Sequence, residues 1–391
     1  MQSLVVWITV LFGFTQLVSV FLLLRRRQLS KLFDQKKSPM AGFKEQQVSP
    51  GISVVTTLKG NDPDQLNWGI KSILNQRYDG PIEFIIVVKT SEEKVYADAA
   101  RIIAENPSSI KIQLLTNPTP VGANPRSAKM AYGFNLTTHP WIYWHCVDTV
   151  PDLHHFRDAM RLTQGDWSKY VTAFPVNVNP KSFGAKIETL GLNVEVVRYF
   201  LFSTVFPKHT VAYGGSTLFH RDLLAKAGGL AQTLDTLTDD EVLAQAFKKV
   251  GATCYLAPHS ARVSQERISF RDFWNRQVRW FMIGRHHLTG LFMLTPFIMV
   301  GQWFLVSGLV FKSTFLIKMG LLVFFMRMIQ GFLFQYFLGT PKRDWLSIWT
   351  LPLYDLLFPI IWVTALLKRQ VGWGGTVMKL GPNGILIRPV I

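Results

Sequence analysis

The hydrophobic pattern divides the chain into an apolar start, a mixed middle and an apolar end. Residues 3–24 carry no charge, and their length fits a helix that spans a bilayer. Arg25, Arg26 and Arg27 follow at once. Since a signal peptide carries its positive charge before the apolar run, this order predicts a retained anchor. The positive-inside rule then places the following residues in the cytoplasm.

In the middle of the chain, short β-branched runs alternate with stretches of helical periodicity. We expect strands near 51–58, 82–88, 110–115 and 141–147, with helices near 66–74, 97–104 and 127–134. This alternation predicts an α/β fold with a mainly parallel sheet. Ligands of such sheets bind at the carboxyl ends of the strands.

The stretch around residues 237–247 predicts the start of a helix whose first turn carries two acidic side chains. Thr238 and Glu241 have the spacing of a capping box, and apolar residues then recur at helical spacing. Asp239 and Asp240 fall in the first turn, where the helix dipole favours an ionised carboxylate. Taken alone, this pattern is also typical of two acids that only stabilise the start of the helix. A carboxylate held on a rigid element can also take a proton from a hydroxyl.

Two further stretches stand out. Asp148 follows the predicted strand near 141–147, where a lone aspartate is either a turn former or a ligand. Residues 269–287 mix aromatic and basic side chains, a pattern typical of a helix in the lipid headgroup layer. Three apolar runs follow, near 291–311, 315–338 and 345–367, and each is long enough to cross a bilayer.

Composition narrows the class of partner. The chain of 391 residues has a net charge of +17, which suits nucleic acid, an anionic membrane surface or an anionic substrate. The apolar runs decide for the lipid bilayer and against nucleic acid. Cys146 and Cys254 are too few for a disulfide framework and weakly favour a reducing compartment. Because the chain has no glycine-rich P-loop, a kinase or an ATPase is disfavoured.

These residues suit sugar transfer from a nucleotide to a membrane lipid acceptor. Mg²⁺ or Mn²⁺, which prefer oxygen ligands, would be held by a carboxylate such as Asp148. Asp240 could deprotonate the acceptor hydroxyl. Arg276 and Arg279 could hold the diphosphate and its leaving charge.

The order of several motifs resembles the ceramide glucosyltransferases, membrane members of the GT-A glycosyltransferases. The most specific is the (R/Q)xxRW motif Arg276-Gln277-Val278-Arg279-Trp280, which follows the acidic pair by a few tens of residues. The other matching stretches are 58–63, 121–126, 141–148, 214–221 and 238–240.

The resemblance implies an inverting transfer of a sugar, expected to be glucose, from a UDP-sugar to ceramide. It also implies roles for individual residues. Asp148 matches the metal- and nucleotide-binding aspartate, and Asp240 the catalytic base with Asp239 before it. Lys59 and Asn124 lie where the family lines the nucleotide pocket.

The same resemblance assigns the (R/Q)xxRW motif and reveals three departures. One of them is that a histidine, which animal members place in the acceptor region before an arginine matching Arg198, appears here as Val196. Arg276, Arg279 and Trp280 match the motif that grips the diphosphate and borders the acceptor channel. Glu92 or Glu93 stands near the place of the family's first aspartate and is expected to contact the substrate. Residues 148–150 do not form a DxD, so the metal site is expected to have one protein ligand.

We therefore expect five regions. They are an anchor (1–27), a cytosolic GT-A catalytic domain (28–268), an interfacial helix with the RxxRW motif (269–288), a transmembrane region (289–368) and a basic cytosolic tail (369–391). Four crossings would put this tail opposite the catalytic domain, whereas its positive charge favours the cytoplasm. One of the apolar runs is thus expected to be re-entrant or interfacial.

Other functions stay open at this point. A processive polysaccharide synthase of the cellulose-synthase kind would need more channel-forming helices, and a scaffold that merely keeps the fold would not need the whole set of acidic and basic residues. Diacylglycerol or a hopanoid alcohol could replace ceramide as the acceptor. Because the chain has no disulfide framework, we favour a bacterial inner membrane over the Golgi.

Overall fold

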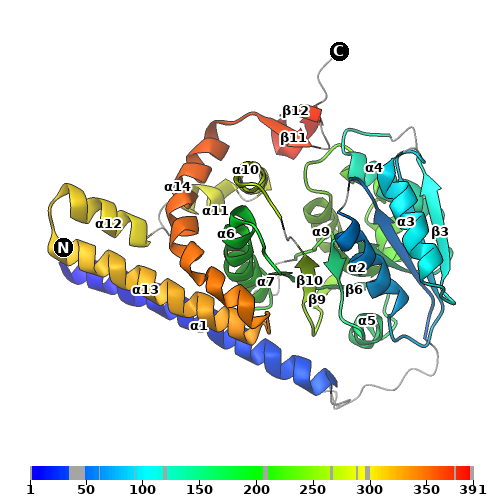
Figure 1. Ribbon diagram of the computed structural model, residues 1–391, viewed down its shortest axis with the longest axis horizontal. Coiled ribbons are helices and arrows are strands. Elements are labelled where there is room, and N and C mark those ends of the chain that lie inside the picture. The colour runs from blue at the N-terminus through cyan, green and yellow to red at the C-terminus, as the bar shows by residue number, and fades with distance from the viewer. Residues whose placement is uncertain are drawn as a thin grey trace.

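The computed structural model consists of an α/β body from which a helical arm projects (Figure 1). It describes residues 2–34, 49–60, 62–91, 93–117, 121–205, 210–264, 267–287, 289–295, 300–373 and 376–387.

A seven-stranded sheet forms the centre of the body, in the order β3-β2-β1-β4-β8-β6-β9. Strands β3, β2, β1 and β4 run parallel, β8 is antiparallel to both of its neighbours, and β6 and β9 are parallel to each other. The sheet is thus mainly parallel, as predicted. Its strands are β1 (Ile52–Thr57), β2 (Ile82–Val88), β3 (Lys111–Thr116), β4 (Trp141–His145), β6 (Lys169–Thr172), β8 (Ser216–His220) and β9 (Thr253–Leu256).

Helices cover both faces of this sheet because its strands are apolar on both sides; β2, for example, is buried from Glu83 to Val88. A small second sheet lies beside it, made of β5 (Thr149–Val150), β10 (Ala261–Ser264) and β7 (Pro175–Val178). The helices of the body are α2 (Pro63–Leu74), α3 (Lys94–Glu105), α4 (Pro125–Asn135), α5 (His155–Thr163), α8 (Arg221–Lys226) and α9 (Asp239–Lys249).

A longer helical segment connects the body to the arm. It comprises α6 (Phe183–Gly191), a π-helical turn η1 (Leu192–Val196) and α7 (Val197–Ser203). This segment is therefore helical from Phe183 to Ser203, with a π-helical turn in its middle.

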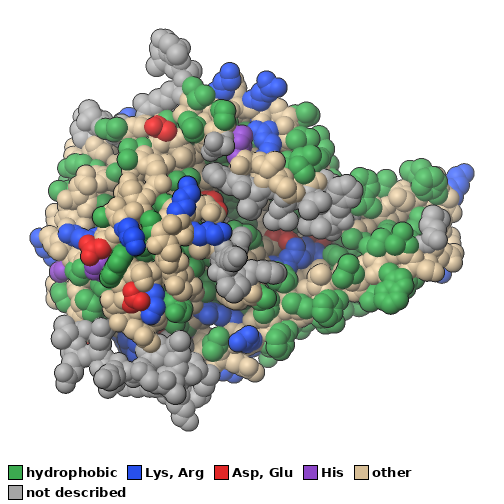
Figure 2. All heavy atoms as spheres, turned by 180° about the vertical axis from the view of Figure 1, so that it is seen from behind, with side chains coloured by type: hydrophobic (Ala, Val, Ile, Leu, Met, Phe, Trp, Pro, Cys, Tyr) green, Lys and Arg blue, Asp and Glu red, His purple; other side chains and the backbone are tan. Residues whose placement is uncertain are grey.

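The arm contains α1 (Gln2–Asp34) and α13 (Thr314–Phe337), which lie side by side, and the shorter α12 (Val300–Val310) (Figure 1). Its surface is largely hydrophobic (Figure 2). In the described residues three helical stretches are long and apolar enough to cross a membrane: 2–31, 314–337 and 342–367. The described part of the apolar run 291–311 contains two short helices, α11 (Thr289–Leu294) and α12.

The last apolar helix, α14 (Leu351–Leu367), is joined to the body at both ends. Just before it, Thr350 Oγ1 donates to the Lys186 carbonyl (3.3 Å). At its other end, Arg285 of α10 (Phe270–His287) donates to the Ala365 and Leu366 carbonyls. Helix α14 is thus bonded to α6 at one end and to α10 at the other.

The expected basic tail has a fold of its own. Strands β11 (Gln370–Trp373), β12 (Thr376–Leu380) and β13 (Leu386–Ile387) form an antiparallel sheet at the end of the described chain. Its apolar residues, such as Met378 and Leu386, share a buried cluster with α10 and α14. The tail is therefore packed on the body.

Candidate active site

Asp239 and Asp240 begin α9, as the sequence predicts, but the predicted capping box does not form. Thr238 is the N-cap residue and makes no side-chain capping bond. The acids take that role: the amide of Asp240 donates to Asp239 Oδ1 (3.1 Å) and that of Glu241 to Asp240 Oδ1 (2.9 Å). The Glu241 carboxylate accepts from Gln245 instead of folding back, so the acids themselves cap the helix.

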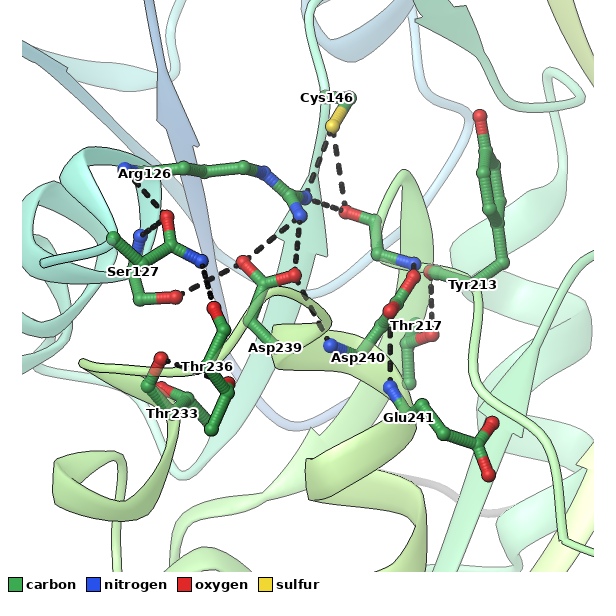
Figure 3. A network of polar contacts seen from close by, with 12 residues as sticks. Arg126, Ser127, Cys146, Tyr213, Thr217, Thr233, Thr236, Asp239, Asp240 and Glu241 are labelled. Carbon is green, nitrogen blue, oxygen red and sulfur yellow. Dashed lines mark hydrogen bonds and ion pairs between the residues drawn. The ribbon is translucent and has the colours of Figure 1, made fainter. Parts of the chain in front are cut away.

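Arg126, at the start of α4, organises the acidic pair (Figure 3). Its Nη1 contacts both carboxylate oxygens of Asp239, at 2.9 and 3.0 Å. Its Nη2 donates to Cys146 Sγ (3.0 Å) and to the Gly214 carbonyl, and its guanidinium lies 5.3 Å from the centre of the Trp144 ring. Sequence reasoning placed Arg126 in a matching stretch but gave it no role.

Asp240 is left as the less compensated acid of the pair. Burial and the neighbouring Asp239 raise the pKa of Asp240 to about 6, against the opposing effect of Arg126. One oxygen, Oδ2, accepts a hydrogen bond from the Gly214 amide (3.0 Å). A carboxylate with a pKa just below neutrality is suited to accept a proton at physiological pH.

Gly214 allows the close approach that links Arg126 to Asp240. A Cβ atom at this position would lie 2.9 Å from both Arg126 Nη atoms and 3.1 Å from Asp240 Oδ2. We expect Gly214→Ala to displace both side chains and to lower the rate of catalysis about 10- to 100-fold, since displacements of about 1 Å have such effects.

Gly372→Ala provides the matched control, because a Cβ there meets no atom within 4 Å. Turnover rates of the two variants, each normalised to folded protein, test this prediction. Equal rates would show that the spacing at Gly214 is not required.

Asp148 lies at the same end of the sheet, just after β4. Thr149 Oγ1 donates to Asp148 Oδ1 (3.2 Å) and also contacts the Tyr213 hydroxyl (3.0 Å). In the described residues no group of three His, Cys, Asp or Glu side chains is placed to hold a metal ion. The role of Asp148 as a single carboxylate ligand stays a prediction.

Other predicted pocket residues lie around this edge. Lys59 is exposed in the turn after β1. Asn124 is fully buried; its Oδ1 caps α4 and its amide donates to the Thr236 carbonyl (2.9 Å). Glu92 lies outside the described residues, and Glu93 is the N-cap residue of α3. The side chain of Asn124 thus holds the chain immediately before the acidic pair.

A lysine that sequence reasoning missed adds positive charge here. Lys129 Nζ donates to the Leu58 carbonyl (2.5 Å), and burial lowers the pKa of Lys129 to about 8. Lys129 lies on α4 one turn after Arg126. The helical periodicity of residues 125–135 could therefore have predicted that the two side chains are neighbours.

The (R/Q)xxRW motif lies on α10, with its two arginines beside a buried acid. Arg276 Nη2 is 3.0 Å from Glu188 Oε1, and the Arg276 guanidinium lies 5.5 Å from the centre of the Trp280 ring. Burial raises the pKa of Glu188 to about 7 and lowers that of Arg279 to about 10. Glu188, on α6, was not among the predicted site residues.

Helix α10 packs within the protein, in contrast to a helix lying alone in the headgroup layer. Phe273, Val278 and Met282 are almost fully buried against α6, α14 and the C-terminal sheet. Phe281 packs edge-on against Phe358 of α14, at 4.7 Å between ring centres. The motif is consequently held at a fixed position relative to the body.

The C-terminal sheet reaches the chain immediately before the acidic pair. The Leu386 amide donates to the Asp235 carbonyl (2.7 Å), and the Leu237 amide donates to the Gly384 carbonyl (3.0 Å). Thr236 and Ile385 form an antiparallel bridge. This sheet, which the sequence suggested only as a basic tail, therefore fixes residues 235–237 from one side while Asn124 fixes them from the other.

The comparison with known protein families shows to which family of enzymes the chain belongs. The sequence profile of glycosyl transferase family 21 matches residues 5–386. The chain belongs to this family. The match includes the arm, the sheet, the acidic pair and the C-terminal sheet, so the family covers every element described above.

Two relatives of known name come from Caenorhabditis elegans. Ceramide glucosyltransferase 1 is 20% identical over 351 residues, which cover 86% of this chain and 72% of the relative. Ceramide glucosyltransferase 3 is 20% identical over 364 residues, which cover 88% and 76%. These relatives confirm the resemblance seen in the motifs.

A solved structure shares the fold. The mannosyltransferase PcManGT from Pyrobaculum calidifontis, in complex with GDP-Man and Mn²⁺, has a TM-score of 0.52 and 13% identity. The similarity covers 94% of this chain and 98% of that one. The predicted GT-A fold, with a mainly parallel sheet and apolar helices at both ends, is thereby confirmed.

Proposed function

We propose that this family 21 glycosyltransferase transfers a sugar, glucose first among the candidates, from a UDP-sugar to the hydroxyl of a membrane lipid such as ceramide. The observation that carries this proposal is the placement of Asp240. Asp240 is half-buried and has a pKa of about 6, and the body that holds it carries an arm whose helices are long enough to cross a bilayer. The family and its two ceramide glucosyltransferase relatives support the lipid acceptor.

In the proposed reaction Asp240 accepts the proton of the lipid hydroxyl, whose oxygen attacks the anomeric carbon from the face opposite the UDP. The bond from that carbon to the diphosphate breaks, and UDP leaves. Arg276, Arg279 and Lys129 would balance the charge of the leaving diphosphate. Arg126 forms an ion pair with Asp239. Its positive charge offsets the repulsion between the carboxylates of Asp239 and Asp240.

A divalent cation fits this site with Asp148 as its protein ligand. Mg²⁺ is usually bound by one or two carboxylates together with substrate phosphates, so the lack of a larger acidic cluster in the described part of the chain is compatible with it. When bound, Mg²⁺ or Mn²⁺ would neutralise the diphosphate. The Mn²⁺ in the mannosyltransferase of the same fold supports this use.

We further propose that the body faces the cytosol, in a bacterial inner membrane more readily than in the Golgi. With α1, the α11–α12 segment and α13 as crossings and α14 on the surface, the basic residues after α1 and after α14 lie on one side. This arrangement removes the conflict that four crossings would create.

The proposed role of Asp240 as the general base predicts how the transfer rate depends on pH. Because Asp240 must be ionised to accept a proton and its pKa is raised to about 6, the transfer rate should rise with pH and level off above that value. Below pH 6 the carboxyl is protonated and the rate should fall about tenfold per pH unit. A profile of kcat/KM that stays flat from pH 5 to 7 would contradict the assignment.

Lipid analysis tests the proposed function in cells. Lipids are extracted from matched cells that express the wild-type chain or Asp240→Asn and are compared by mass spectrometry. The proposal predicts a hexose-bearing lipid that is present only with the wild type. A labelled insoluble polymer would instead favour a polysaccharide synthase, and identical extracts with no new polymer would favour a scaffold.

A further inference from the structure

A basic cavity of about 160 Å³ lies where the end of α1 meets the body. Its walls include Arg26 and Arg27 of α1, Arg262 of β10, Asp152, and the apolar side chains of Leu23 and Phe337. The described residues that line it include none of those assigned above to the candidate active site. The cavity has room for about five water-sized groups, which is enough for a phosphate group.

The cavity lies at the ends of two helices that are long enough to cross a bilayer, α1 and α13, which run side by side to the body (Figure 1). In α1 the uncharged run 3–24 ends just before the arginines. The Arg27 guanidinium lies 5.5 Å from the centre of the Tyr336 ring and 5.6 Å from that of Phe337, at the end of α13, so the two ends are level with each other. Lipid headgroups begin where such apolar spans end. The cavity is therefore at the depth of lipid phosphate groups when the arm spans a bilayer.

Contacts between α1 and the body hold the walls of the cavity in place. Arg26 Nη2 donates to the Leu256 carbonyl (2.5 Å), and Ser30 Oγ lies within hydrogen-bond distance of His259 Nδ1 (2.9 Å). Leu23 is 2% exposed and belongs to the same buried cluster as Leu256. The cavity is thus formed by packed elements of the fold.

The charges of the walls favour an anion. Among the described residues of the walls, three guanidinium groups are opposed by one carboxylate, that of Asp152, whose Oδ1 accepts from the His154 amide (2.9 Å). Arg26 Nε is buried and has no hydrogen-bond partner in the described part of the chain. Buried donors nearly always have partners, and a guanidinium has five N–H groups to satisfy. A phosphate group would supply several acceptor oxygens in the geometry that fits a guanidinium.

The apolar surface next to the cavity suits hydrocarbon chains. Leu17 and Phe21 are 69% and 62% exposed and lie on one face of α1, four residues apart. On α13, Phe332 and Tyr336 are each 47% exposed. A ligand with an anionic head and hydrocarbon chains therefore fits both the cavity and the helices that lead to it. A phosphatidylcholine head fits less well, because its choline group would place a positive charge beside the arginines.

We propose that this cavity, the arginine site, binds the phosphate head of an anionic phospholipid whose hydrocarbon chains lie along α1 and α13. Bound there, the phosphate would join Arg26 and Arg27 of α1 to Arg262 of β10 and so attach the body to the membrane at a fixed depth. This inference goes beyond the proposed function: the lipid is neither the donor nor the acceptor, and the site requires only that the arm lies in a bilayer.

The test uses Arg27→Gln/Arg262→Gln, which removes two charges of the site and keeps the bond from Arg26 to the Leu256 carbonyl. Full-length protein in phosphatidylcholine nanodiscs is titrated with a photoreactive phosphatidylglycerol, and the labelled peptides are identified by mass spectrometry. We expect labelling of the wild type at residues 23–30 and 258–262. The variant should bind the lipid about 30-fold more weakly, as expected when two arginine contacts to an anionic headgroup are removed. The midpoint of thermal unfolding shows whether both proteins are folded.

The matched control is Arg25→Gln/Lys31→Gln. It removes two exposed charges from the same end of α1, and neither residue lines the cavity. We expect labelling of the site to stay within about threefold of the wild type, because exposed charges outside the site are screened by salt. An equal loss in the two double variants would overturn the proposal, since it would show a general attraction of anionic lipid to the basic end of the helix. Lack of labelling at these peptides in the wild type would overturn it as well.

Two further measurements identify the ligand. Arg27→Lys/Arg262→Lys keeps both charges and should retain most of the labelling, because lysine also binds phosphate. A folded lysine variant that loses as much labelling as the glutamine variant would contradict the proposal. In the wild type, neither an excess of inorganic phosphate nor phosphatidylcholine should displace the phosphatidylglycerol. Displacement by phosphate would assign the site to a free anion, and displacement by phosphatidylcholine would remove the preference for an anionic head; these two results decide even if the glutamine variant does not fold.

Discussion

The Asp240→Asn variant is expected to bind the donor normally and to lose transfer by about 10²- to 10⁴-fold, the usual contribution of a general base. The amide keeps the size of the carboxyl and can still accept from the Gly214 amide (3.0 Å), so the site should keep its shape. It cannot take a proton from the acceptor. Steady-state transfer rates and UDP binding by calorimetry measure the two halves of this prediction.

Glu241→Gln is the control for that variant, since Glu241 is the next residue of the same helical turn and its carboxylate contacts only Gln245 among the hydrogen bonds described (2.8 Å). We expect its transfer rate to stay within about threefold of the wild type, as is usual for a residue outside the chemistry. Near-normal turnover in Asp240→Asn, or an equal loss in both variants, would remove Asp240 from its role.

Arg126→Met should have the largest effect on stability among single substitutions at the site. It leaves the buried Asp239 carboxylate, whose side chain is 5% exposed, without its ion-pair partner. Breaking a buried pair in this way typically costs about 3–5 kcal/mol. Asp240 would also lose the positive charge that opposes the rise of its pKa, so any remaining activity should require a higher pH.

A double variant separates the charge from the packing. In Arg126→Met/Asp239→Leu no buried charge is left unpaired, and we expect most of the lost stability to return while transfer stays low. The midpoint of thermal unfolding in detergent, followed for the two variants and the wild type, measures this. A double variant less stable than Arg126→Met alone would show that the pair is needed for packing.

Local patterns in the sequence were sufficient to predict the elements of the body. The strand over 82–88 and the helix that begins at Asp239 follow from apolar runs and helical spacing, which depend on neighbouring residues. The acidic pair was found for the same reason, because its place on the first turn of a helix is a local property. The class of enzyme came from the order of motifs, which the family comparison confirmed.

Contacts between distant residues were not predictable in this way. Glu188 meets Arg276 from 88 residues away, and Arg126 reaches Asp239 across 113. Glu188 and Arg126 have no local sequence pattern that indicates these pairings. A single charged residue within a helical pattern does not show which distant residue it contacts. The role of the C-terminal sheet was missed for a similar reason: its hydrogen bonds to residues 235–237 are made by the backbone, whose partners no side-chain motif reveals.

The most direct test of the account is a transfer assay with purified protein in nanodiscs, given ceramide, Mn²⁺ and UDP-glucose that is labelled in the sugar. The account predicts that the label moves into the organic phase as a lipid with one β-linked glucose, and that Asp240→Asn leaves it in the aqueous phase. Label that remains in water with the wild type while ceramide and UDP-glucose are both bound would contradict the account. Label in an insoluble polymer would contradict it as well.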